Sequence, residues 1–173
     1  MVRQDARNSR FGYTHCLLSE SIRLPARMPT FSDDSRTTFD WPVRVYYEDT
    51  DAGGVVFYAN YLRFMERGRT EWLRALGCEQ DDLRQREGIL FTVRRVEIDY
   101  LAPALFNDLL TVRSAIVHLG GASLDFAQTV LRESDGMVCC QGRVKVACVD
   151  AATFRPRRLP ASLLSGIPSE PSA

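Results

Sequence analysis

Three acidic residues, Glu48, Asp49 and Asp51, stand together in the segment YYEDTDAGG. The glycine pair Gly53-Gly54 follows them, and an apolar stretch with helical spacing begins a few residues later. A helix N-terminus presents unpaired N–H groups and about half a positive charge, so it can stabilise an oxyanion without a cationic side chain. A carboxylate just before such a helix can act on the same carbonyl group as a base or a nucleophile.

This arrangement suits a thioester, because the thioester carbonyl is weakly stabilised by resonance and its thiolate leaves readily. An aspartate is ordinarily ionised at pH 7, so activation by a Ser/His pair is not required. By pattern alone, the segment also fits a solvated acidic loop that complements the charge of a helix N-terminus. Such loops are common, and the pattern leaves both interpretations open.

The elements that must hold this loop follow from the spacing of apolar residues. Val43, Val45 and Tyr47 alternate with polar residues and predict a strand before the loop. After the loop, the spacing predicts a helix of about 17 residues, with Asn60 as its N-cap and Gly77 as its C′ residue.

The predicted helix carries a glycine, Gly68, on the same stripe as Phe64 and Trp72, which are expected in the core. Glycine destabilises a helix by about 1 kcal/mol relative to alanine. A glycine here therefore indicates close packing against a neighbour. A short second helix is expected over residues 80–87.

The rest of the chain predicts β-structure. Four strands are expected, over residues 89–101, 109–119, 122–133 and 138–149. A change of phase at Arg94-Arg95 predicts a bulge in the first of them, and tight turns predict an antiparallel meander of the last three. We therefore expect one α+β domain, in which a five-stranded antiparallel sheet wraps around a long central helix.

We expect this domain to span residues 39–160. Residues 1–38 are rich in Arg, Ser, Thr and Asp without a periodic apolar pattern, which predicts a disordered or loosely packed extension. Met28, inside it, offers an alternative start. Prolines among Ser and Ala predict a flexible tail over residues 161–173.

The bulk composition excludes several classes of function. Lys plus Arg and Asp plus Glu each number 22, so no overall field draws the chain to nucleic acid or to an anionic membrane. No apolar run approaches the ~18 residues of a membrane span, and no signal peptide is recognisable. Five cysteines and two histidines without a CxxC motif make a metal site unexpected, and free thiols such as Cys140 and Cys148 fit a reducing cytoplasm.

The segment from Val43 to Trp72, VRVYYEDTDAGGVVFYANYLRFMERGRTEW, resembles the active-site motif of the 4-hydroxybenzoyl-CoA thioesterase-like hotdog proteins. The likeness continues through FTVRRVEIDYLAPALFNDLLTV, GGASLDFAQTV and VKVACVD, and is nearest to the acyl-CoA thioesterases associated with the Tol-Pal system of Gram-negative bacteria. It implies a single hotdog domain that hydrolyses acyl-CoA in the cytoplasm, without metal or redox cofactor. It also implies a homodimer or homotetramer with its site at a subunit interface, and acyl carrier protein as an alternative partner.

The resemblance assigns roles to individual residues. Asp51 matches the catalytic carboxylate, which attacks the carbonyl or activates water. Tyr47 matches an aromatic residue beside the site, and Gly53 and Gly54 match the loop that lets the thioester approach the backbone. The backbone N–H of Tyr58, or of its immediate neighbours, matches the oxyanion donor.

Other positions carry weaker assignments. Glu48 and Asp49 are given loop and structural roles. Ser123, in GGASLDF, matches a small hydroxyl residue that reaches a neighbouring subunit's site, whereas the pattern by itself favours a hydroxyl that merely flanks the turn. Tyr58 is a departure, because the Tol-Pal-associated branch usually has His there and the branch acting on aromatic acyl groups tends to have Tyr.

Two rival functions follow from the same fold. A hotdog hydratase or dehydratase uses a His with a carboxylate as its acid–base pair, and the motif here has no His. A non-catalytic module that binds CoA or acyl carrier protein needs no carboxylate at the position of Asp51. Both features favour the thioesterase.

Overall fold

The structure is a computed structural model, and it describes residues 38–167. The extension expected over residues 1–38 lies outside the described residues except for its last residue. Residues 168–173 of the expected tail lie outside them as well. Met28 and Cys16 are among the residues not described.

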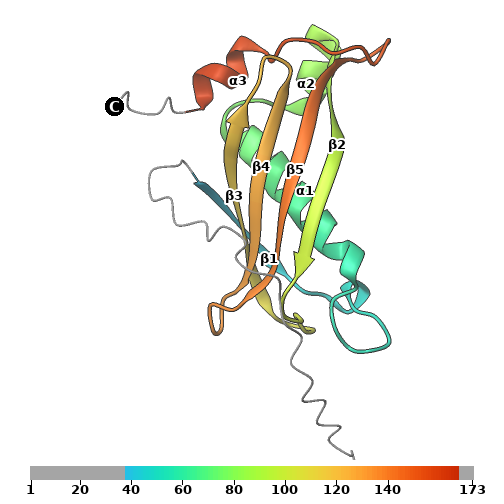
Figure 1. Cartoon of the computed structure of the whole chain (residues 1–173), viewed down its shortest axis with the longest axis vertical. Coiled ribbons are helices and arrows are strands. Elements are labelled where there is room, and N and C mark those ends of the chain that lie inside the picture. Colours follow the sequence, from blue (N-terminus) through green and yellow to red (C-terminus); the bar gives the residue numbers. More distant parts are fainter. Residues whose placement is uncertain (1–37, 168–173) are drawn as a thin grey trace, which may run out of the picture. The chain divides into compact units, whose positions relative to one another are not determined.

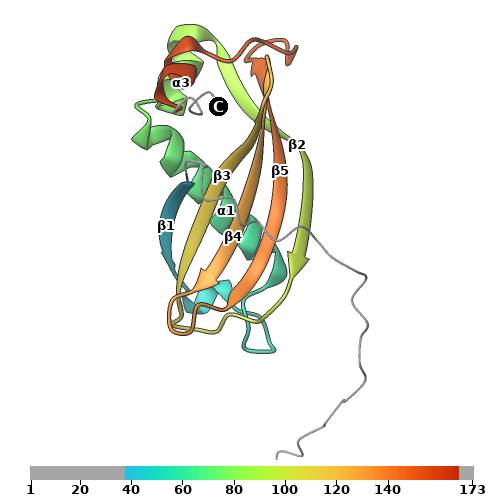
Figure 2. The same ribbon diagram turned by 60° about the vertical axis from the view of Figure 1, so that its left-hand side comes forward.

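Five strands form one antiparallel sheet in the order β1-β3-β4-β5-β2, as Figures 1 and 2 show. Their bounds are β1 Thr38–Arg44, β2 Ile89–Tyr100, β3 Leu109–Leu119, β4 Ser123–Arg132 and β5 Val138–Asp150. All neighbouring pairs are antiparallel, and β3, β4 and β5 form the expected meander. The five-stranded antiparallel sheet is therefore confirmed, and its two edges are β1 and β2.

The strands show the alternation that the sequence predicts. Side chains of β4 are alternately buried and half-buried, because successive residues of a strand point to opposite faces of the sheet. The pairing of β2 with β5 shifts register between Val93 and Arg95, which confirms the bulge. Cys140 and Cys148 of β5 are fully buried free thiols, as expected for the apolar face of this strand.

The first strand lies earlier in the chain than predicted. Strand β1 ends at Arg44, and the short 3-10 helix η1, Tyr47–Asp49, occupies the residues assigned to the end of the strand. The Asp49 carboxylate accepts the N–H of Tyr46 at 2.9 Å, and the Asp49 N–H donates to the Tyr46 carbonyl at 3.0 Å. These bonds turn the chain, and the alternation of apolar residues carries no signal for them.

Helix α1, Tyr58–Ala75, has 18 residues and lies behind the sheet in the view of Figure 1. Phe64 and Trp72 are buried on it, as expected. A Cβ atom on Gly68 would lie 3.0 Å from Cγ1 of Val112 in β3. The glycine therefore permits the close packing that the sequence indicates.

The two ends of α1 differ in how well the sequence predicts them. Gly77, with a φ of +77°, donates its N–H to the Arg74 carbonyl at 2.9 Å, as expected of a C′ residue. Asn60 is not the N-cap, because that position is Phe57 and Asn60 lies inside the first turn. The buried Asn60 side chain instead donates to the carbonyl of Asp49 at 3.0 Å.

The remaining elements are short. Helix α2, Gln80–Asp82, and the π-helix η2, Leu83–Glu87, form where the second helix was expected. Residues 161–166, assigned to the flexible tail from their composition, instead form helix α3, Ala161–Gly166. Leu163 of α3 is fully buried in a cluster with Trp72. Apolar contacts therefore fix this part of the chain despite its Ser and Pro content.

Candidate active site

The Asp51 carboxylate stands on a tight turn. The Asp51 N–H donates to the Val55 carbonyl, and the Gly54 N–H donates to the Asp51 carbonyl, both at 2.9 Å. The Gly53 N–H donates to Oδ1 of Asp51 at 2.8 Å. Asp51 is exposed, and its Oδ2 has no hydrogen-bond partner among residues 38–167. One carboxylate oxygen is thus fixed and the other is open to solvent.

The turn needs both of its glycines. A Cβ on Gly53 would lie 3.1 Å from Oδ1 of Asp51, so a larger residue would press on the carboxylate. Gly54 has a φ of +75°, a conformation that L side chains rarely adopt. Both glycines are exposed, so a bound molecule can approach their backbone beside the carboxylate.

Asp49 connects the same loop to the start of α1 by hydrogen bonds. It is only 6% exposed, unlike Glu48 and Asp51, which are exposed. Its carbonyl accepts the N–H of Phe57 at 2.8 Å and the side-chain amide of Asn60 at 3.0 Å. These bonds hold the first residues of α1 at a fixed position beside the turn.

The N-terminus of α1 offers free donors. Asn60 donates its N–H to the Phe57 carbonyl at 2.8 Å, whereas the N–H groups of Tyr58 and Ala59 find no acceptor among residues 38–167. The first turn contains no acidic residue to neutralise the helix dipole. An oxyanion at this point would therefore meet unpaired N–H groups and a partial positive charge.

Contacts with the loop before β3 hold the helix start in place. The Val56 N–H donates to the Ala104 carbonyl at 2.8 Å, and the Ala104 N–H donates to the Tyr61 hydroxyl at 3.1 Å. Burial raises the pKa of Tyr61 to about 12, so its hydroxyl stays protonated at neutral pH. The turn that carries Asp51 is thus braced from two sides.

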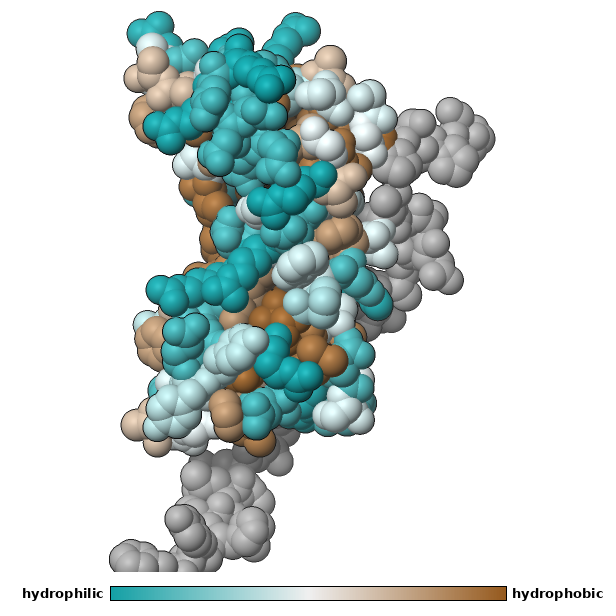
Figure 3. All heavy atoms as spheres, turned by 180° about the vertical axis from the view of Figure 1, so that it is seen from behind, coloured by the Kyte–Doolittle hydropathy of each residue, from teal (hydrophilic) through white to brown (hydrophobic). Residues whose placement is uncertain are grey.

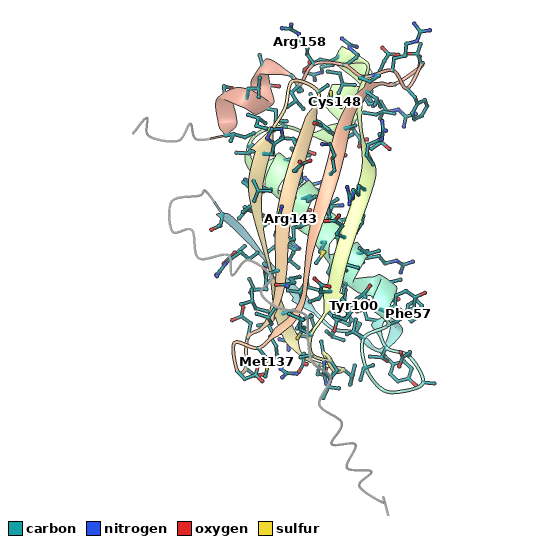
Figure 4. The ribbon with its side chains drawn as sticks, viewed as in Figure 1. Phe57, Tyr100, Met137, Arg143, Cys148 and Arg158 are labelled. Carbon is teal, nitrogen blue, oxygen red and sulfur yellow. The ribbon has the colours of Figure 1, made fainter. Side chains whose placement is uncertain are left out.

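Exposed aromatic side chains surround the loop. Tyr47 is 81% exposed, and its ring meets Phe106 edge-on with centroids 6.2 Å apart. The Tyr58 ring lies 4.5 Å from that of Phe57 and 6.3 Å from that of Tyr100. Figure 4 shows Phe57 and Tyr100 at the same end of the sheet. These rings offer an exposed apolar surface that a bound molecule can contact.

Ser123 is not brought into this site within one chain. It begins β4, next to Ala122, whose carbonyl accepts the N–H of Cys148 at 2.9 Å. Figure 4 shows Cys148 at the opposite end of the sheet from Tyr100. The strand pairing places Tyr100 of β2 level with Cys140 of β5 and with Val130 of β4. Ser123 lies seven residues before Val130, which corresponds to about 23 Å along the strand.

The chain resembles known proteins over most of its length. A model of the thioesterase-like superfamily matches residues 45–167. The chain belongs to this superfamily. The acyl-CoA thioester hydrolase YbgC of Escherichia coli O6:H1 is 43% identical over 129 residues, which are 75% of this chain and 95% of that protein. The acyl-CoA thioesterase YbgC of Haemophilus influenzae is 44% identical over 122 residues, 70% of this chain and 88% of that protein.

A solved structure of a probable thioesterase from Bartonella henselae superposes with a TM-score of 0.68 and 38% sequence identity. The superposition covers 72% of this chain and 100% of that one. The resemblance to hotdog thioesterases is therefore confirmed. The superfamily match spans the acidic loop, α1 and all of the sheet except β1.

Two further findings concern residues 38–167. They contain no group of three or more His, Cys, Asp or Glu side chains arranged to hold a metal ion. No helix formed by them combines the length and apolar character needed to cross a bilayer.

Asn60, Tyr61 and Tyr100 contact the parts of the candidate site, and the sequence pattern assigns none of them to it. Asn60 and Tyr61 hold the helix start by hydrogen bonds to distant backbone groups, and Tyr100 packs beside Tyr58. For these three residues, the sequence offers one signal, the polar side chain of Asn60 at a position predicted to cap the helix. The partner of each residue is set by tertiary structure, so spacing cannot reveal it.

Proposed function

We propose that the protein hydrolyses acyl-CoA thioesters to a free acid and CoA, with Asp51 as the catalytic carboxylate. The observation that carries the proposal is an exposed Asp51 carboxylate, with one oxygen held by the Gly53 N–H, in the loop before a helix whose first N–H groups, those of Tyr58 and Ala59, find no acceptor among residues 38–167. The identity to two acyl-CoA thioesterases over most of the chain supports the same activity.

The reaction begins when the thioester carbonyl oxygen accepts hydrogen bonds from the N-terminal N–H groups of α1. Those bonds stabilise the negative charge that develops on this oxygen. In one route Asp51 attacks the carbonyl carbon, the C–S bond breaks and CoA thiolate leaves, and water then cleaves the mixed anhydride. In the other route Asp51 takes a proton from a water molecule that attacks the carbon directly. Both routes yield the acid and CoA without metal or redox cofactor.

Further residues bind the substrate in this proposal. Gly53 and Gly54 let the thioester approach the backbone, and the rings of Tyr47 and Tyr58 contact its organic part. Tyr58 stands where a relative acting on aliphatic acyl groups would carry His, so we include aromatic acyl groups among the candidate substrates. Acyl carrier protein is the alternative carrier of the acyl group.

The active form in this proposal is a homodimer or a homotetramer. Strand β2 is an edge of the sheet, and Val93, Val96 and Tyr100 on it are 48%, 39% and 46% exposed. An exposed edge strand is a template for pairing with another chain. A second copy would also bring its own Ser123 toward the site, which one chain alone leaves about 23 Å away along β4.

We assign the enzyme to the cytoplasm. The described cysteines, Cys78, Cys139, Cys140 and Cys148, are all free and buried. Free thiols are typical of a reducing compartment. Burial raises the pKa of Cys140 to about 12, so this thiol is not a nucleophile.

The direct experiment incubates the purified full chain with a panel of aliphatic and aromatic acyl-CoAs and a thiol-reactive dye. Steady release of thiol from at least one member supports the proposal. Binding of every acyl-CoA without thiol release would instead indicate a binding module. Addition of water to an enoyl-CoA with the thioester intact would indicate a hydratase.

A further inference from the structure

Helix α1 covers only part of the inner face of the sheet. Gly68 brings it against Val112 of β3, toward the β1 edge. The inner side chains of the opposite edge strand, β2, are left partly uncovered, as the exposures of Val93, Val96 and Tyr100 show. Figure 3, which views the molecule from behind, shows hydrophobic side chains along its left edge, the side of β2 in this reversed view.

A hollow of about 100 Å³ opens between the second half of α1 and this part of the sheet. Its floor is made of apolar side chains from β2, β4 and β5, among them Phe91, Phe126 and Val146. Its wall is polar except for Leu73. The wall residues are Glu66, Arg69, Thr70 and Leu73 of α1 and Gln80 of α2. The hollow has room for the end of a hydrocarbon chain but not for a whole acyl-CoA.

The same flank of α1 leads from the catalytic loop to the hollow. Tyr58, Leu62, Glu66 and Arg69 follow one another at intervals of four, four and three residues, which keeps them on one side of a helix. At 1.5 Å per residue, Arg69 lies about 16 Å along α1 from Tyr58. An extended chain with C–C bonds near 1.5 Å advances about 1.3 Å per bond, so about twelve carbons span this distance.

Arg69 is half-buried, and its guanidinium donates one hydrogen bond within residues 38–167. Its Nη1 donates to Oε1 of Gln128 at 2.7 Å, and among residues 38–167 it forms no ion pair. A guanidinium has five N–H donors, so several remain for another acceptor. Burial lowers the pKa of Arg69, and the charge of Glu66 opposes this shift only in part. Charges in such surroundings are usually paired with an opposite charge.

Hydrogen bonds fix the groups on both sides of Arg69. The buried Gln128 amide donates to the Met65 carbonyl at 2.9 Å and to Oγ of Ser114 at 2.8 Å, which turns its oxygen toward Arg69. On the other side, Gln80 donates to Thr70 at 2.9 Å and Thr70 donates to Glu66 at 2.8 Å. Glu66 thus accepts a hydrogen bond from Thr70 and forms no ion pair with Arg69 among residues 38–167, while its charge still acts on the guanidinium.

We propose that this hollow binds the far end of the acyl group and that Arg69 recognises a carboxylate there, so that an ω-carboxyacyl-CoA of about twelve carbons is preferred over the plain acyl-CoA of the same length. The inference rests on the proposed function, because it takes the thioester to lie at the N-terminus of α1. An apolar hollow without Arg69 would disfavour a carboxylate, since burial of an unpaired charge costs free energy.

The first test compares kcat/KM for two matched pairs of substrates with the native full chain. The long pair is dodecanoyl-CoA and the CoA monothioester of dodecanedioic acid, and the short pair is hexanoyl-CoA and the monothioester of adipic acid. We expect the carboxylate to be favoured at least about tenfold in the long pair, the gain typical of a charged hydrogen bond, and not in the short pair, which cannot reach Arg69. Preference for dodecanoyl-CoA, or an equal carboxylate preference at both lengths, would overturn the inference.

The second test uses Arg69→Met and Arg69→Lys, with Arg67→Met on the exposed side of α1 as the matched control. The ratio of kcat/KM for the long pair should fall at least about tenfold in Arg69→Met, through KM, and less in Arg69→Lys, which keeps the charge. It should not change in Arg67→Met. An unchanged ratio in a folded Arg69→Met would overturn the inference. If no member of either pair releases thiol while an aromatic acyl-CoA does, this inference has failed; if no acyl-CoA of either kind releases thiol, the proposed function itself has failed.

Discussion

The three acidic side chains before α1 differ in what surrounds them. Glu48 is exposed without a described partner, Asp49 is buried and hydrogen-bonded, and Asp51 is exposed with one oxygen held by Gly53. A positioned but accessible carboxylate is what the chemistry requires, and only Asp51 combines both properties. Spacing alone does not distinguish the three acids, and only the resemblance singles out Asp51; the turn then gives each carboxylate a different environment.

We expect Asp49→Ala to destabilise the fold. The substitution removes the acceptor of the Tyr46 N–H, and loss of a buried hydrogen-bond partner costs about 1–3 kcal/mol. Urea unfolding of Asp49→Ala measures this loss, with the exposed Glu48→Ala as control, which should change the free energy of unfolding by less than about 0.5 kcal/mol. Equal effects of the two substitutions would mean that Asp49 does not brace the loop.

Substitutions of Tyr58 test whether its backbone N–H or its side-chain hydroxyl binds the oxyanion. If its backbone N–H is the donor, Tyr58→Phe should be nearly silent in turnover. Tyr58→His should keep substantial activity and shift preference toward aliphatic acyl groups. Turnover of both variants on one aromatic and one aliphatic acyl-CoA decides the matter. A hundredfold loss in Tyr58→Phe would show that the hydroxyl takes part in the reaction.

At the scale of elements, the sequence predicts well what local spacing determines. The sheet strands after residue 88, the bulge near Arg95 and the cap at Gly77 all appear where the pattern indicates. The sequence fails where tertiary contacts decide. The Asn60 side chain donates to the Asp49 carbonyl instead of capping α1. Leu163 lies in a short helix because it packs into the apolar cluster that contains Trp72.

Substitution of Gly68 tests the close packing of α1 against β3. A leucine at Gly68 would meet Val112 and Ser114 of β3, and overpacking of this kind costs about 1–3 kcal/mol. Arg67→Leu, one position away on the exposed side of α1, should change stability by less than about 0.5 kcal/mol. The denaturation midpoints of the two variants give the comparison. If Gly68→Leu unfolds at the native midpoint, the close approach of α1 to β3 does not constrain this position.

At the scale of the whole molecule, the edge strand β2 and the position of Ser123, about 23 Å along β4 from the level of Tyr100, both favour a site completed by a second copy. Sedimentation equilibrium should then give at least twice the chain mass of 19.6 kDa. Specific activity should fall when the protein is diluted until the oligomer dissociates. A monomer whose specific activity does not depend on concentration would rule out a shared site.

The catalytic role of Asp51 is the central claim, and one comparison tests it most directly. Turnover of Asp51→Asn and Asp49→Asn is measured on one acyl-CoA, with melting curves to establish that both variants are folded. Asparagine is nearly isosteric with aspartate but cannot serve as an anionic base or nucleophile. Asp51→Asn should therefore lose at least about 10²-fold in turnover while still binding the substrate, and Asp49→Asn should lose much less. If Asp51→Asn is active and Asp49→Asn is inactive, the catalytic carboxylate is Asp49. If both variants keep full activity, the result contradicts a carboxylate mechanism altogether.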